Sequence, residues 1–159
     1  MPFHNPGLLK PGDCLLYKPS SLTGLIIAVK TWTWISHVEV YAGDGLSWAS
    51  RDGIGVNRYP TRYSDLAYVR RPLRFTRHHF FNMGAWFETV RGQKYDWLGL
   101  LCFTLAVKQG AKDRMFCSEF ALNLYRAAGL NVLAKDCVPD HTAPSEFLQT
   151  PALTTVWRD

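Results

Sequence analysis

Residues 35–41 alternate between two sets of side chains, and this pattern constrains the fold more than any other part of the sequence. Every second residue, His37 and Glu39 among them, falls on one side of an extended chain, and the residues between fall on the other. Gly43-Asp44-Gly45 follows and is typical of the tight turn of a β-hairpin. Residues 46–50 then return as the partner strand. The sequence therefore predicts an antiparallel hairpin that carries His37.

The rest of the chain supplies further strands and a largely helical second half. We expect further strands at 14–17, 56–59, 65–70 and 153–157, the last at an edge, and helices at 22–30, 77–90, 96–107 and from Cys117 onward. The 159 residues fit one domain, 1–159, without internal repeats. The predicted class is α+β, with one small, curled antiparallel sheet packed against helices.

Residues 1–6 lack the charged and then apolar pattern of a signal peptide. The apolar run at 97–107 is shorter than the roughly 20 residues that cross a bilayer. Four cysteines without a C-x-x-C pair indicate reduced thiols rather than a disulfide scaffold. We therefore expect a cytoplasmic protein.

The chain carries a formal net charge of +5, and four arginines cluster in a short stretch: Arg70, Arg71, Arg74 and Arg77. Such a cluster suits an anionic cell-wall or membrane surface, and it also suits an ordinary solvated connection. No groove-reading motif accompanies it, so nucleic-acid binding is not expected. The oligomeric state is not indicated by the sequence.

Cys117 opens a predicted helix and is followed by Ser118. The helix dipole and the free N–H groups of the first turn, that of Ser118 included, favour a thiolate and offer donors to an oxyanion. A cysteine at such a position is also often a simple packed thiol. His37, mounted on a strand with Glu39 on the same face, is a candidate base with a candidate orienting group, or else a pair of ordinary sheet residues. Residues i and i+2 stand about 6 to 7 Å apart along a strand, so we expect their contact to need a bent side chain or a water.

Four motifs carry a resemblance to a known family. They are Pro11-Gly12-Asp13, then Ser36-His37-Val38-Glu39-Val40-Tyr41 with its glycine turn, then Gly92-Gln93-Lys94-Tyr95-Asp96, then Phe116-Cys117-Ser118-Glu119-Phe120. In this order they resemble the circularly permuted NlpC-type papain-like hydrolases, and the YiiX-like branch most. The resemblance covers about residues 11–148 and places the histidine strand before the cysteine helix.

The resemblance implies that Cys117 is the nucleophile, that His37 is the general base and that Tyr95 lines the site. It places Trp48 near the position where the family carries a polar orienting residue. Tryptophan has only one N–H donor and cannot replace a carboxylate, so Glu39 is the predicted substitute and Ser50 the alternative.

The predicted reaction is acyl transfer through an acyl-enzyme, on a peptide or other acyl-containing substrate. An amide in a peptide, including a cell-wall peptide, is the first hypothesis. A lipid thioesterase or acyltransferase is the second, and a binding module with a decayed site, suggested by Trp48, is the third. No metal or cofactor is predicted: His78 and His79 diverge by about 100° on a helix, while His141 is a candidate substrate contact from a loop.

Overall fold

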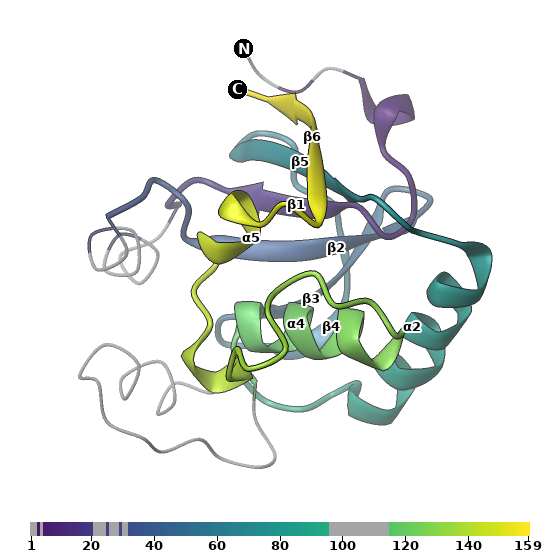
Figure 1. Cartoon of the computed structure of the whole chain (residues 1–159). Helices are drawn as coiled ribbons and strands as arrows, with labels where there is room; N and C mark the ends of the chain where they lie inside the picture. The colour runs from purple at the N-terminus through teal and green to yellow at the C-terminus, as the bar shows by residue number, and fades with distance from the viewer. Residues whose placement is uncertain (1–2, 4, 21–24, 26–28, 30–31, 96–114) are drawn as a thin grey trace.

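The computed structural model describes residues 3, 5–20, 25, 29, 32–95 and 115–159 (Figure 1). Within them lies a six-stranded open sheet in which every pair of neighbours is antiparallel, in the order β4-β3-β2-β1-β5-β6. The strands are β1 (Cys14–Tyr17), β2 (His37–Gly43), β3 (Leu46–Arg51), β4 (Gly55–Pro60), β5 (Leu66–Pro72) and β6 (Leu153–Arg158). The helices are α2 (Arg77–Val90), α4 (Cys117–Ala127) and α5 (Glu146–Gln149), with short 3-10 turns η1 (Pro6–Leu8) and η2 (Pro139–His141). The predicted α+β class is confirmed.

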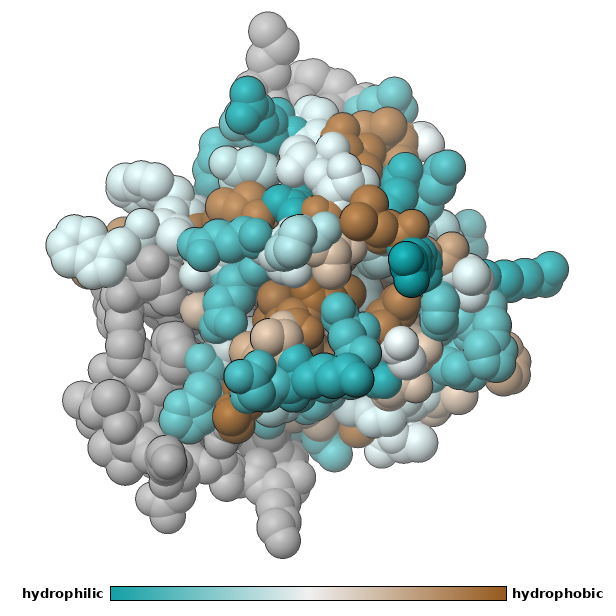
Figure 2. Space-filling model, in the orientation of Figure 1, coloured by the Kyte–Doolittle hydropathy of each residue, from teal (hydrophilic) through white to brown (hydrophobic). Residues whose placement is uncertain are grey.

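Helices α2 and α4 cover one face of the sheet (Figure 1). The main core lies between them and the strands, and its largest fully buried side chains include Trp48, Phe87 and Phe120. Trp48 stacks against Phe80 and Phe87 of α2, with ring centroids 5.2 and 5.8 Å apart. On the molecular surface seen in the same direction, apolar residues gather near the centre and polar residues surround them (Figure 2).

A second, smaller cluster covers the opposite face and joins the two ends of the chain. Leu15 and Tyr17 of β1 pack there with Phe3. The ring of Phe3 stands edge-on to that of Trp157 in β6, with centroids 5.0 Å apart. This contact holds the N-terminal segment against the last strand.

The residues just beyond α2 lie along the edge strand β4. The N–H of Val56 donates to the Gln93 carbonyl at 2.8 Å, and the N–H of Gly92 donates to the Val56 carbonyl at 2.9 Å. Gly55 has a φ of +97°, and a Cβ at this position would stand 2.1 Å from the Gln93 carbonyl oxygen. Only glycine permits both the backbone conformation and this close approach. The N–H of Met115 then donates to the Lys94 carbonyl at 3.2 Å, which ties the same segment to the start of α4.

The predicted strands agree with the observed ones to within a few residues, and the helix at 77–90 is observed with those bounds. Thr76 caps it, since its hydroxyl accepts the N–H of His79. The predicted helix at 96–107 lies outside the described residues, as does most of the one at 22–30. In the described part of the chain, no helix combines the length and the apolar character needed to span a membrane.

Candidate active site

Cys117 is the first residue of α4, and its thiol is buried with 1% of the residue exposed. Phe116 before it is extended, with φ −90° and ψ 172°, so the helix begins abruptly at the cysteine. Burial alone would raise the pKa of Cys117, but the charge and hydrogen bond of His37 and the backbone N–H groups of Val38 and Ser118 outweigh burial and lower it. The site thus shifts the thiol toward its thiolate form.

His37 is the first residue of β2, and its side chain is 16% exposed. Its Nε2 lies 3.0 Å from Oε1 of Glu39, which leaves Nδ1 as the ring nitrogen for Cys117. Burial would lower the pKa of His37, but Cys117 and Glu39 outweigh burial and raise the pKa to about 9. Both pKa shifts run in the direction that favours a thiolate and imidazolium pair.

Glu39 has no exposed surface and contacts His37 directly, without the water considered from the strand spacing. Arg51 donates to both of its oxygens, Nε to Oε1 at 2.8 Å and Nη2 to Oε2 at 3.1 Å. The hydroxyl of Tyr17 donates to Oε2 at 3.3 Å. Burial would raise the pKa of Glu39, but His37 and then Arg51 outweigh burial and lower it to about 2. The carboxylate is thus held charged and in one orientation.

Arg51 and Tyr17 are the two partners that sequence reasoning missed. Val40 pairs with Trp48 across β2 and β3, so continuing this register by three residues brings Arg51 opposite His37. A carboxylate predicted on a buried strand needs a cation or donors. This requirement is the signal that the sequence offered for a cation near Glu39, whereas the register that supplies Arg51 depends on a β-bulge between Tyr41 and Gly43 and cannot be read from spacing.

The structure does not bring Trp48 to His37. Trp48 belongs to the face covered by α2 and lies in the main core. Within the described part of the chain, no group accepts a hydrogen bond from the indole nitrogen. The predicted place of Trp48 near the orienting position is therefore wrong in space, because its side chain points to the opposite side of the sheet from Glu39.

The hydroxyls of Ser50 and Ser118 bond backbone carbonyls near the start of α4 or packed against it, and not His37. The hydroxyl of Ser50 donates to the Met115 carbonyl at 2.5 Å, and the hydroxyl of Ser118 donates to the Thr142 carbonyl at 2.5 Å. Both residues are fully buried. Ser50 thus positions the chain that enters α4. Ser118 contacts the sulfur of Cys117 through its backbone N–H and not through its hydroxyl.

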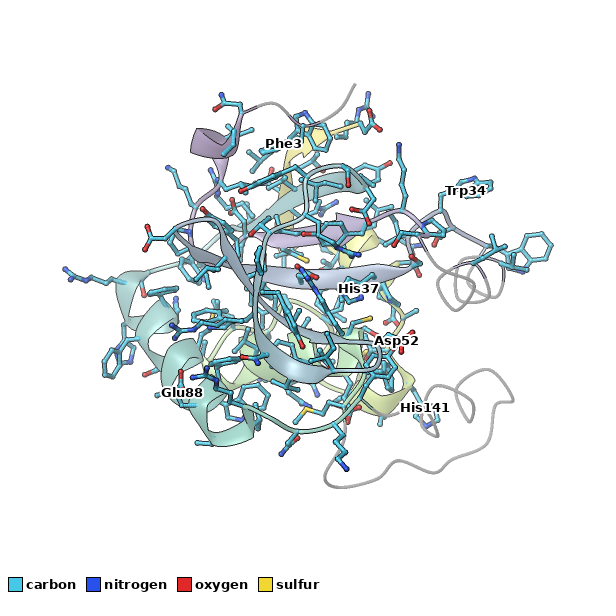
Figure 3. The ribbon with its side chains drawn as sticks, turned by 180° about the vertical axis from the view of Figure 1, so that it is seen from behind. Phe3, Trp34, His37, Asp52, Glu88 and His141 are labelled. Atoms are coloured by element: carbon cyan, nitrogen blue, oxygen red, sulfur yellow. The ribbon has the colours of Figure 1, made fainter. Side chains whose placement is uncertain are left out.

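Tyr95 is buried, and it comes directly after Lys94 in the segment that runs alongside β4. His141 is exposed at the end of η2, and η2 packs against α4. Figure 3 shows His37, Asp52 and His141 on the same side of the molecule. This side is the end of the sheet where β2 begins.

The four clustered arginines do not form one exposed surface. Arg70 is 9% exposed and donates to the carbonyls of Leu148, Thr150 and Leu153. Arg71 pairs with Asp13, with 2.7 Å between Nε and Oδ1. These two arginines serve the fold, so the predicted basic surface for an anionic partner rests on the exposed Arg74 and Arg77 alone.

Comparison with known proteins gives a match among solved structures. No family model matches the chain, and no curated protein matches it. Among solved structures, metalloprotein yiiX from Escherichia coli O157:H7, described as DUF1105, superposes with a TM-score of 0.72. It is 17% identical, and the match covers 94% of this chain and 97% of that one. The fold is therefore YiiX-like.

That relative is described as a metalloprotein, but the residues of this site do not fit a metal ion. Among the described residues, no three His, Cys, Asp or Glu side chains converge as ligands. Both oxygens of Glu39 already accept hydrogen bonds from Arg51, and Oε1 also meets His37. A guanidinium thus stands where a metal would have to neutralise the carboxylate.

Proposed function

We propose that this protein is a cysteine hydrolase that forms an acyl-enzyme on Cys117. The observation that carries the proposal is the chain of contacts from Cys117 to His37 and on to Glu39, with the sulfur at the N-terminus of α4. Nucleophile, base and orienting group stand on rigid elements in the order that acyl transfer needs. The order of histidine strand before cysteine helix also matches the permuted papain-like resemblance.

The reaction follows from these roles. The sulfur of Cys117 forms a bond to the substrate carbonyl carbon, and backbone N–H groups at the start of α4 stabilise the oxyanion. As the carbon–nitrogen or carbon–oxygen bond breaks, imidazolium His37 gives its Nδ1 proton to the leaving group. Water then attacks the thioester while His37 takes the water proton, and the carboxylic acid departs from the regenerated thiolate.

An amide in a peptide, cell-wall peptides included, is the substrate class that the resemblance favours. A basic surface at Arg74 and Arg77 suits an anionic polymer. The argument for a decayed binding module rested on Trp48, and it loses its support because Glu39, not Trp48, contacts His37.

A second candidate, hydrolysis or transfer of lipid acyl chains, is favoured by the exposed apolar side chains around the site. Six of the eight large apolar residues exposed in the described chain lie on connections at the end of the sheet where β2 begins: Leu25, Val29, Trp32, Trp34, Ile54 and Val138. Trp32 is 94% and Trp34 is 76% exposed, and Figure 3 shows Trp34 at the periphery on the side of His37. Tryptophan is the side chain typical of a boundary between lipid and water.

The first experiment is alkylation of the purified protein with limiting iodoacetamide at about pH 6, where an ordinary thiol of pKa about 8.5 is almost entirely protonated. Mass spectrometry then locates the label. We expect selective labelling of Cys117 over Cys14, Cys102 and Cys137, and loss of that selectivity in His37→Ala. Equal labelling of all four thiols, or a His37→Ala variant as reactive as the wild type, contradicts the proposal.

The two substrate classes are separated by a panel of peptide amides and long-chain acyl esters. If lipid is the substrate, the double variant Trp32→Ser/Trp34→Ser loses ester turnover on vesicles yet keeps Cys117 alkylation. If peptide is the substrate, the same variant keeps its turnover.

A further inference from the structure

Arg51 binds Glu39 through a two-pronged ion pair at the end of β3. Beyond these two bonds, its Nη2 donates to the Pro60 carbonyl at 3.0 Å. Its guanidinium carbon lies 4.3 Å from the centroid of the Tyr59 ring. The side chain is 20% exposed, whereas Glu39 has no exposed surface. The fork of Arg51 is therefore fixed from three directions, and it closes the solvent side of a buried carboxylate.

Oxygen Oε1 of Glu39 is the atom shared by the two neighbours. It accepts from Nε of Arg51 at 2.8 Å and meets Nε2 of His37 at 3.0 Å. Oε2 takes the second prong of Arg51 together with the Tyr17 hydroxyl. Rotation of the carboxylate would break contacts on both oxygens, so Arg51 fixes the direction in which Oε1 faces the histidine ring.

We propose that Arg51 is a positioning residue of the site, which keeps Glu39 ionised and oriented so that His37 can hold a proton on Nε2 and serve Cys117 through Nδ1. The assignment rests on the proposed cysteine chemistry. It adds a fourth member to the chain of charges: thiolate, imidazolium, carboxylate and guanidinium alternate in sign. Arg51 does not touch the reacting atoms and acts only through Glu39.

Without the guanidinium, a carboxylate as deeply buried as that of Glu39 takes up a proton far more readily. The nearest source is His37 itself, through the bond from Nε2 to Oε1. After that transfer the histidine ring is neutral and its remaining proton lies on Nδ1, facing Cys117. The thiolate then loses the imidazolium that stabilises it and takes up a proton from solvent to become a thiol.

The other groups around Glu39 do not replace Arg51. Tyr17 on β1 and Tyr59 on β4 are neutral phenols, and burial raises the pKa of both. Arg62, with its guanidinium carbon 4.8 Å from the Tyr17 ring centroid, is paired with Asp65 at 3.5 Å. Among the described residues, Arg51 is thus the arginine or lysine that bonds the Glu39 carboxylate.

The test is the pH profile of Cys117 alkylation in wild type, Arg51→Met, Arg51→Lys and the control Arg58→Met. Arg58 lies on the neighbouring strand and pairs with Glu88 at 3.3 Å, away from the site. We expect Arg51→Met to react about tenfold more slowly at about pH 6 and to approach the wild-type rate at alkaline pH, since one pKa unit is a factor of ten. Arg51→Lys, which keeps the charge, retains most of the alkylation rate at about pH 6. The control Arg58→Met has the same pH profile as the wild type.

A second readout needs no catalysis. In the Cys117→Ala background, the ¹⁵N shifts of His37 distinguish an imidazolium from a neutral ring protonated on Nδ1. At about pH 6, where a free histidine of pKa about 6.5 is largely protonated, we expect the imidazolium with Arg51 and the neutral ring in Arg51→Met.

Three results overturn the assignment of Arg51. One is an unchanged profile in Arg51→Met. Another is a more basic His37 in that variant, because Glu39 would then stay ionised without its cation. The third is an equal loss of reactivity at every pH with a lowered melting temperature, which is the mark of a purely structural residue. If instead wild-type Cys117 is unreactive while the ¹⁵N result holds, the hydrolase proposal fails and the positioning role survives.

Discussion

His37 and Glu39 stand two residues apart on the same strand, and their side chains meet directly, with 3.0 Å between Nε2 and Oε1. Neighbours of this kind on a strand normally point the same way without touching. Here Arg51 and Tyr17, on the two adjoining strands, donate hydrogen bonds that hold the Glu39 carboxylate in position. The proposed base and its proposed orienting group are thereby carried by a single strand, and their spacing does not depend on how two elements dock.

Replacing Cys117 or His37 by alanine should abolish turnover while leaving the fold intact. Losing the nucleophile or its base costs at least about a thousandfold in comparable enzymes. The measurement is turnover on whichever substrate the panel identifies, with circular dichroism and thermal unfolding as controls of folding. Full activity in either variant would contradict the mechanism.

Glu39→Gln should lower turnover more than Ser50→Ala. The amide can present an N–H where the carboxylate accepted a hydrogen bond, so His37 loses the partner that stabilises its charge. Ser50→Ala removes a hydrogen bond to the Met115 carbonyl and costs about 1 kcal/mol of stability, with little change at the ring of His37. Kinetics on both purified variants decide the order. The reverse order would move the orienting role to β3.

Stability should fall in acid because of Glu39. Its pKa is lowered from 4.5 to about 2 in the folded protein, so the stabilisation it gives is complete above about pH 4.5 and is lost as the pH falls through about 2. Asp159, whose pKa is also lowered to about 2 through Lys18, titrates in the same window. The free energy of unfolding, measured with urea between about pH 5 and about pH 3, should therefore fall with a shallower slope against pH in Glu39→Gln than in wild type. Equal slopes would mean that Glu39 does not contribute.

Arg70→Met should destabilise the fold strongly. The variant leaves three carbonyls, those of Leu148, Thr150 and Leu153, without their donor, which is expected to cost about 3 kcal/mol. Arg74→Met is the matched control, since Arg74 is exposed four residues away and should change the unfolding free energy by less than about 0.5 kcal/mol. A small effect at Arg70 would show that the C-terminal segment is held by its other contacts.

Sequence patterns predicted the strands, the helix at 77–90 and the helix that begins at Cys117 well because these depend on local periodicity. The glycine turn after β2 and the start of α4 at Cys117 are both of this kind. What failed depends on register and on contacts distant in the chain. A β-bulge between Tyr41 and Gly43 shifts the pairing of β2 with β3, so the placement of Trp48 could not be read from spacing. Arg70 looked like a surface charge because its partners lie about eighty residues further along the chain.

Gly55 shows how such a site can be lost without any change in its chemistry. A side chain here would push against the Gln93 carbonyl, and the next residue, Lys94, holds Met115 two positions before the nucleophile. The displacement caused by a single methyl group would therefore pass along the backbone from Gln93 through Lys94 and Met115 to the cysteine. A descendant gene with alanine at this position would still encode Cys117, His37 and Glu39, so a search for those three residues alone would not detect that the backbone behind them had been forced to move.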